Sequence, residues 1–230
     1  MGSSHLILKA ENITKIYKKY KSQSLLIFED SSFEVSKGET VSVVGTSGCG
    51  KTTLLQVCGL LDDVDSGQIV IDSIVSSGLS NKDKTAIRRK YIGFVYQMHY
   101  LFPEFSVLEN VMLPLLVDNS KDKKTIKENA IDLLAELGLH DKINNMPSEL
   151  SGGEKQRVAI ARAIIHKPPL ILADEPTGNL DSDNSEKVIN ILLKLINKFN
   201  LSLLMVTHDL SIARKTDRIL TIKNKKITNY

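Results

Sequence analysis

The stretch "ETVSVVGTSGCGKTTLLQVC" places an apolar run, a glycine-rich loop and a second apolar run directly one after another. Its loop, "GTSGCGKT", has the pattern G-x-x-x-x-G-K-[ST], in which glycines let backbone N–H groups surround a phosphate. A buried strand that runs into such a loop and then into a helix is typical of α/β proteins with a parallel sheet. We therefore predict that the chain folds around this strand–loop–helix unit.

The same segment predicts a site for a nucleoside triphosphate and a magnesium ion. Lys51 is expected to reach the β- and γ-phosphate oxygens, the Thr52 hydroxyl to ligate Mg²⁺, and Thr53 to donate to the α-phosphate. The predicted nucleotide-binding residues here are Gly45, Thr46, Ser47, Gly48, Cys49, Gly50, Lys51, Thr52 and Thr53. A turn that only links strand to helix is the alternative, and the complete motif in its context favours phosphate binding. Cys49 occupies a free position, where a small filler residue is the favoured interpretation.

Four more candidate residues follow three apolar runs that are predicted to be strands. "PLILADE" ends in Asp174, a predicted Mg²⁺ ligand, and Glu175, which is placed to polarise an attacking water. "LLMVTHD" brings His208 to a strand end, where it could contact the γ-phosphate, and Gln97 after "GFVY" could reach Mg²⁺ or the water. Each of these residues alone would be an ordinary polar residue where a strand runs into a loop. Their combination with the glycine-rich loop that contains Lys51 favours the catalytic interpretation.

"ELSGGEKQR" predicts a second place that can hold a phosphate. Ser151 reads as the N-cap of a helix with Glu154 three residues further on, and Gly152 and Gly153 allow an anion to approach the backbone. The partial positive charge of a helix N-terminus suits a phosphate. One small chain thus carries two phosphate cradles.

The remaining pattern predicts the fold class. Two β-rich runs open the chain, strands then alternate with helices, and a helical block interrupts them. We expect an α/β fold with a mostly parallel sheet core, an antiparallel β region at the N-terminus and an inserted α-helical subdomain. The expected single domain is 6–230, with the core at 6–87 and 166–230 and the helical subdomain at about 88–165.

Composition excludes some classes of function. The chain has 230 residues, of which 42% are hydrophobic, and a formal charge of +3, too balanced to indicate nucleic acid as a partner. We find no apolar run near the roughly 18–20 residues that cross a bilayer, and no secretory signal, so a cytosolic protein is expected.

Taken together and in this order, the motifs resemble those of the ATP-binding cassette (ABC) ATPase family, along nearly the whole chain. The resemblance implies a P-loop NTPase that hydrolyses ATP to ADP and phosphate. It implies a head-to-tail homodimer, in which Ser151, Gly152 and Gly153 cap the γ-phosphate held by Lys51 of the other copy. It also implies an aromatic residue that stacks on adenine, for which Tyr17 matches best and Tyr20 competes.

The segment "YQMHYLFPEFSVLENVMLPLL" is similar to the branch of this family that releases lipoproteins from the bacterial inner membrane. Met98, Tyr100, Leu101, Phe102 and Phe105 are too apolar for a solvated loop, and partial burial within the domain is the alternative to an exposed groove. The resemblance implies two integral membrane subunits docked around residues 97–105, on the cytoplasmic face of that membrane. An ATPase for macrolide or peptide efflux and a cell-division switch are the competing functions.

Overall fold

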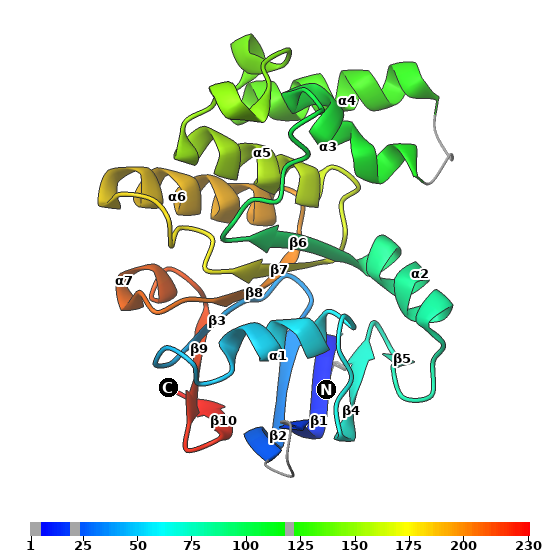
Figure 1. The fold of residues 1–230 in the computed structure, drawn as a ribbon, viewed down its shortest axis with the longest axis vertical. Coiled ribbons are helices and arrows are strands. Elements are labelled where there is room, and N and C mark those ends of the chain that lie inside the picture. Colours follow the sequence, from blue (N-terminus) through cyan, green and yellow to red (C-terminus); the bar gives the residue numbers. More distant parts are fainter. Residues whose placement is uncertain (1–5, 19–23, 118–121) are drawn as a thin grey trace.

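The computed structural model describes residues 6–18, 24–117 and 122–230 (Figure 1). Tyr20, the competitor of Tyr17, lies outside these ranges. In the described residues, no helix combines the length and the apolar character that a membrane crossing requires.

A six-stranded sheet in the order β10-β9-β3-β8-β7-β6 forms the centre of the molecule. The strands are β3 (Thr40–Val44), β6 (Ile92–Tyr96), β7 (Leu170–Asp174), β8 (Ser202–Val206), β9 (Arg218–Lys223) and β10 (Lys226–Asn229). β9, β3, β8, β7 and β6 pair in parallel, whereas β10 is antiparallel to β9. Because both faces of the sheet are covered, every residue of β3 and β8 is buried. The predicted mostly parallel sheet is confirmed.

The predicted antiparallel region is a second sheet, in the order β2-β1-β4-β5. Its strands are β1 (Leu6–Lys18), β2 (Ser24–Ser36), β4 (Ser66–Ile71) and β5 (Ile74–Val75). Helix α1 (Lys51–Cys58) lies between the two sheets (Figure 1). One hydrophobic core fills this layer and includes Phe28, Val43, Leu54 and Ile69, each at most 1% exposed. The packing holds α1, and with it the glycine-rich loop, in a fixed place.

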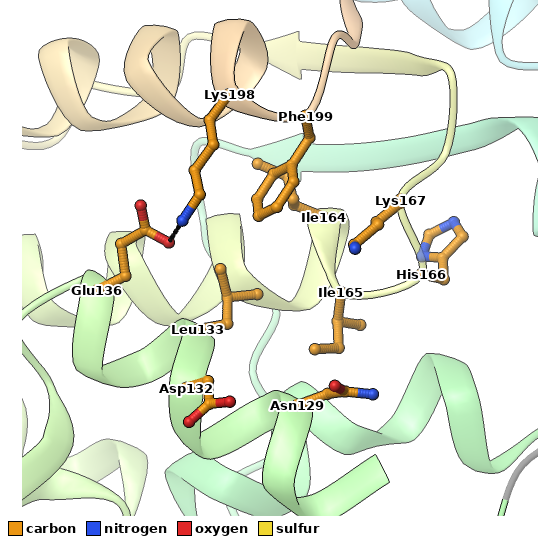
Figure 2. Close-up of a pocket in the computed structure, with 10 residues that line it drawn as sticks. All are labelled: Asn129, Asp132, Leu133, Glu136, Ile164, Ile165, His166, Lys167, Lys198 and Phe199. Atoms are coloured by element: carbon orange, nitrogen blue, oxygen red, sulfur yellow. Dashed lines mark hydrogen bonds and ion pairs between the residues drawn. The ribbon is translucent and has the colours of Figure 1, made fainter. Parts of the chain in front are cut away.

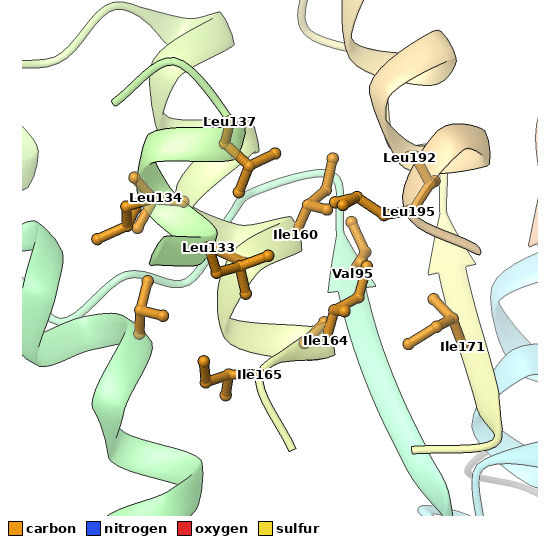
Figure 3. Packing of buried hydrophobic residues seen from close by; sticks show 14 of the residues in the cluster. Val95, Leu133, Leu134, Leu137, Ile160, Ile164, Ile165, Ile171, Leu192 and Leu195 are labelled. Atoms are coloured by element: carbon orange, nitrogen blue, oxygen red, sulfur yellow. The ribbon is translucent and has the colours of Figure 1, made fainter. Parts of the chain in front are cut away.

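Helices lie in two layers on the other side of the central sheet (Figure 1). They are α3 (Val107–Leu116), α4 (Lys123–Glu136), α5 (Gly152–Ile164) and α6 (Ser182–Lys198), with short helices η1 (His140–Lys142) and η2 (Pro147–Glu149) before α5. α3 and α4 pack on α5. α2 (Asn81–Tyr91) leads into β6, and α7 (Leu210–Ala213) follows β8. Figure 3 shows Ile160 and Ile164 of α5 between the strand residue Val95, Leu133 of α4 and Leu195 of α6. α5 is therefore the buried link between the helical layer and the sheet.

The division into a core and a helical subdomain stays a proposal. Within the segment 88–165 that we assigned to the helical part, β6 pairs in parallel with β7 along its whole length. By this pairing β6 belongs to the central sheet, and the helical insertion begins after Tyr96. The single run of apolar residues before Gln97 did not indicate which strand it would pair with.

Candidate functional site

The glycine-rich loop connects the end of β3 to the start of α1. Gly50 has φ 106°, a left-handed conformation, and a Cβ on it would lie 2.4 Å from Cγ2 of Ile27. A Cβ on Gly45 would lie 2.6 Å from Sγ of Cys49. Glycine is required at Gly50 by its left-handed backbone, whereas a Cβ on Gly45 would displace the Cys49 side chain. The Cys49 side chain fills the space beneath Gly45, in agreement with the filler interpretation.

The Lys51 side chain is 9% exposed and lies inside the curve of this loop. Its Nζ donates to the carbonyl oxygens of Gly45, at 2.9 Å, and of Thr46, at 3.3 Å. The Glu175 carboxylate oxygen Oε1 lies 3.8 Å from the same nitrogen. The ammonium group therefore bridges the loop and the end of β7.

Thr52 and Asp174, the predicted magnesium ligands from two different segments, are in contact. The Thr52 hydroxyl donates to Asp174 Oδ1 over 3.3 Å. Burial raises the pKa of Asp174, the hydroxyl of Thr52 opposes this, and the charge of Glu175 adds to it. Hydroxyl and carboxylate oxygens are the hard ligands that Mg²⁺ prefers, and a nearby cation would favour the ionised form of this buried acid. The residues present thus fit the ion.

Glu175 and His208, the two predicted catalytic residues, are paired. Glu175 has φ 44°, and its N–H donates to the carbonyl of Val206 at the end of β8. Its Oε2 lies 2.8 Å from Nδ1 of His208 and accepts from the His208 N–H at 3.3 Å. The Glu175 side chain is 16% exposed and that of His208 is 68% exposed. The parallel strands thus bring the carboxylate and the imidazole to one edge of the sheet.

Gln97 is tethered to the loop after Glu175. Its Nε2 donates to Oδ1 of Asn179 at 3.1 Å, and Nδ2 of Asn179 donates back to the Gln97 carbonyl at 3.1 Å. A Cβ on Gly178 would lie 2.7 Å from the Gln97 Nε2, so this close approach depends on glycine. The sequence analysis assigned no role to Asn179, which lies in the loop after β7.

The turn 151–153 starts α5 as predicted. The Ser151 side chain accepts from the Glu154 N–H at 3.3 Å, and a Glu154 carboxylate oxygen accepts from the Ser151 N–H at 2.8 Å. Ser151 and Gly152 are exposed, and Gly153 is buried near Asn184. Over the described ranges, the hydrogen bonds of Ser151 go to Glu154 and Lys155 of the same helix and do not reach residues 45–53.

Tyr17 lies on β1 and is held through its hydroxyl. The hydroxyl donates to Asp62 Oδ2 at 3.0 Å, and Lys15 Nζ lies 4.9 Å from the centre of the Tyr17 ring. Lys15 also forms an ion pair with Asp62 at 2.8 Å. The ring is thus fixed near the C-terminal end of β1, an inner strand of the antiparallel sheet, and its stacking on adenine stays a prediction.

The apolar loop that follows Gln97 is exposed. Met98 is 64% exposed, Tyr100 63%, Phe102 51% and Phe105 37%, whereas Leu101 packs against the helical core. The alternative of partial burial therefore holds for Leu101 but not for the other four. Large apolar side chains gathered in this way on a surface are typical of a protein–protein contact.

Two residues that sequence reasoning missed shape this loop. Asn110 of α3 is fully buried, accepts from the Phe102 N–H at 2.8 Å, and donates to the carbonyls of Phe102, Phe105 and Ser106. The Arg162 guanidinium of α5 donates to the carbonyls of His99, at 2.6 Å, and Tyr100, at 2.5 Å, both in left-handed conformations. A polar side chain within an apolar helix is the signal that could have indicated Asn110.

The profile of the ABC transporter family matches residues 28–178 of the chain. The chain belongs to the ABC transporter family. This confirms the expected fold class, and the protein is an ATPase that binds ATP. A solved ABC cassette, MJ0796, described as a dimeric post-hydrolysis state bound to ADP and Pi, superposes with a TM-score of 0.88 at 38% identity over 96% of each chain.

Curated ABC proteins similar to the chain include lipoprotein-releasing system ATP-binding proteins named LolD. The LolD of Aquifex aeolicus is 47% identical over 96% of each chain. That of Psychrobacter arcticus is 44% identical over 97% of this chain and 99% of its own. That of Buchnera aphidicola is 42% identical over 99% of both. The resemblance to this branch of the ABC family, first indicated by residues 96–115, therefore extends over nearly the whole chain.

We predict that Asn110→Leu destabilises the ABC cassette and loosens the exposed loop. The change leaves backbone groups of Phe102, Phe105 and Ser106 without their partner, at a cost of about 1–3 kcal/mol in the free energy of unfolding. Urea unfolding measures the stability, and the rate of chymotrypsin cleavage after Tyr100 or Phe105 measures how accessible the loop is.

Met112→Leu, on the same helix, is the control and should change stability by less than about 1.5 kcal/mol, since it conserves volume and the Met112 side chain forms no hydrogen bond with the residues that the structure describes. Equal cleavage rates for Asn110→Leu and the wild type would contradict the role of Asn110.

Proposed function

We propose that the chain is the ATP-hydrolysing subunit of a membrane ABC complex that releases lipoproteins from the bacterial inner membrane. The observation that carries this proposal is the exposed apolar loop after Gln97, whose sequence is of the lipoprotein-release type. The identity to several LolD proteins supports it. The chain would work at the cytoplasmic face of that membrane as a peripheral protein, and the transported molecule would be an acylated lipoprotein.

In this proposal the edge of the central sheet is the ATP site. Lys51 and the N–H groups of residues 45–53 bind the phosphates, and Tyr17 stacks on adenine. Thr52, Asp174 and Gln97 hold Mg²⁺, which, when bound, shields the phosphate charge. Glu175 orients and polarises the attacking water. His208, which lies 2.8 Å from the Glu175 carboxylate, contacts the γ-phosphate.

Two copies would share each ATP. Ser151, Gly152 and Gly153 of one copy would cap the γ-phosphate bound to Lys51 of the other. The exposure of Ser151 and Gly152 supports this arrangement, because the helix N-terminus is accessible to a second molecule. The dimeric form of the solved relative MJ0796 supports it too.

The membrane subunits would dock next to the exposed loop, in a groove of about 530 Å³ between α2, β6, α3 and α5. Phe102 lines this groove together with Tyr96, the residue before Gln97. Closure of the dimer on ATP would move the docked subunits and extract the lipoprotein. Such coupling is needed because each buried CH₂ group resists extraction by about 0.8 kcal/mol.

We predict that Glu175→Gln stops hydrolysis and traps an ATP-bound dimer. The amide keeps the size of the side chain and can still accept from the His208 N–H, but it cannot act as a base. Phosphate release measures turnover, and size-exclusion chromatography with ATP and Mg²⁺ measures the dimer. Glu186→Gln, an exposed carboxylate on α6, is the control and should keep wild-type turnover. Full turnover by Glu175→Gln, or a monomer with ATP, would count against the proposed site.

We predict that the tagged chain captures two lipoprotein-release membrane subunits from detergent-solubilised membranes of its own organism. Mass spectrometry of the captured proteins measures this, and untagged membranes are the control. Capture of a four-helix cell-division protein, or of efflux subunits, would replace the proposed function with one of the two alternatives.

A further inference from the structure

The groove beside the exposed loop combines an apolar floor with positive charge. Its apolar lining comes from Leu61, Ile92, Phe94, Tyr96, Phe102, Leu113, Pro114, Val117 and Ala163. Its charged lining comes from Arg88, Arg89 and Arg162, and none of the described residues that line it is an aspartate or glutamate. The groove is therefore apolar and electropositive at once.

The arginine charges of the groove are not compensated within the chain. Arg88 donates to the carbonyl of Leu60 at 2.6 Å and to the hydroxyl of Thr85 at 2.7 Å, and Arg162 donates to carbonyls of the exposed loop. All these acceptors are neutral. Over residues 6–18, 24–117 and 122–230, the ion pairs of the chain do not include Arg88, Arg89 or Arg162. Burial lowers the pKa of Arg162, which reflects a charge held partly away from water.

A second cavity, on the other side of the C-terminal end of α5, shows the opposite arrangement. It has a volume of about 510 Å³ and lies between α4, α5 and α6 (Figure 2). There Lys198 is paired with Glu136 at 2.6 Å, and Asp132 lies on the same wall. His166 lines both cavities. The second cavity is lined by two lysines, Lys167 and Lys198, and by two acids, Asp132 and Glu136, so a charged lining without any acidic residue distinguishes the groove from its neighbour.

We propose that the groove selects a cytoplasmic helix of the membrane subunit that carries an aspartate or glutamate beside its apolar face. The apolar face would pack on Ile92, Phe94 and Phe102, and the carboxylate would face Arg88 and Arg89. This inference rests on the proposed function and adds the chemistry of the partner. Opposite charges next to an apolar contact fix the register of the helix and exclude partners of the wrong sign.

Arg89 is the residue to test, because it is exposed and Arg88 also holds the Leu60 carbonyl. The Arg89→Glu variant turns attraction into repulsion and should reduce the membrane subunits captured from solubilised membranes by about fivefold to tenfold. Lys90→Glu makes the same charge change on the next residue of α2, outside the groove lining, and should reduce capture by less than about twofold. Thermal unfolding checks that both variants are folded, and Arg89→Gln, with an intermediate loss, replaces Arg89→Glu if that variant unfolds.

A photocrosslinking residue in place of Phe102 identifies what lies in the groove of the complex in native membranes. The expected product joins the chain to a membrane-subunit helix with a carboxylate within two turns of the crosslink. Changing that carboxylate to lysine should restore capture by Arg89→Glu.

The possible results separate this inference from the proposed function. Equal capture by Arg89→Glu and Lys90→Glu, a crosslinked helix without acidic residues, or a crosslink to lipid would overturn the inference and leave the lipoprotein-release proposal standing. A wild-type chain that captures no membrane subunit would overturn both.

Discussion

The meeting of parallel strand ends at one edge of the central sheet is the constraint on which the site depends. β3, β7 and β8 are paired in parallel, so the residues that follow them arrive together. Lys51 is the first residue of α1, which follows β3 and its loop, Glu175 directly follows β7, and His208 lies two residues after β8. The Lys51–Glu175 distance of 3.8 Å and the Glu175–His208 distance of 2.8 Å follow from this arrangement. In a buried sheet of this kind, side chains far apart in sequence are positioned by backbone pairing and not by their own contacts.

The sequence was sufficient to predict which residues meet at this edge of the sheet, because each contributing segment has a strong local pattern. These segments are the glycine-rich loop between an apolar strand and a helix, and the apolar runs that lead to Asp174 and His208. The boundary of the helical insertion did not follow from sequence, since β6 is assigned by pairing with β7, a partner more than seventy residues away. The role of Asn110 was not predicted for a similar reason, because its four hydrogen bonds go to a loop whose path the sequence does not specify.

The exposed loop after Gln97 is shaped by long-range contacts at both ends. Asn179 holds Gln97 near the catalytic edge, and Asn110 holds the segment from Phe102 to Ser106. The loop therefore keeps four apolar side chains in solvent without relying on their burial for its own order. A surface that is rigid before it binds loses less entropy on association, which favours a role in docking.

Helix α5 joins the two ends of the proposed mechanism. Its first turn carries the Ser151 cap, and Arg162 near its last turn holds the carbonyls of His99 and Tyr100. Eight of its 13 residues are buried, and a helix of that size is about 20 Å long. A helix packed on several sides moves as one body, so a displacement of the turn 151–153 toward a partner's phosphate would also displace the loop through Arg162. The same guanidinium lines the electropositive groove. A movement of the turn 151–153 on nucleotide binding would therefore reach the docked helix through α5.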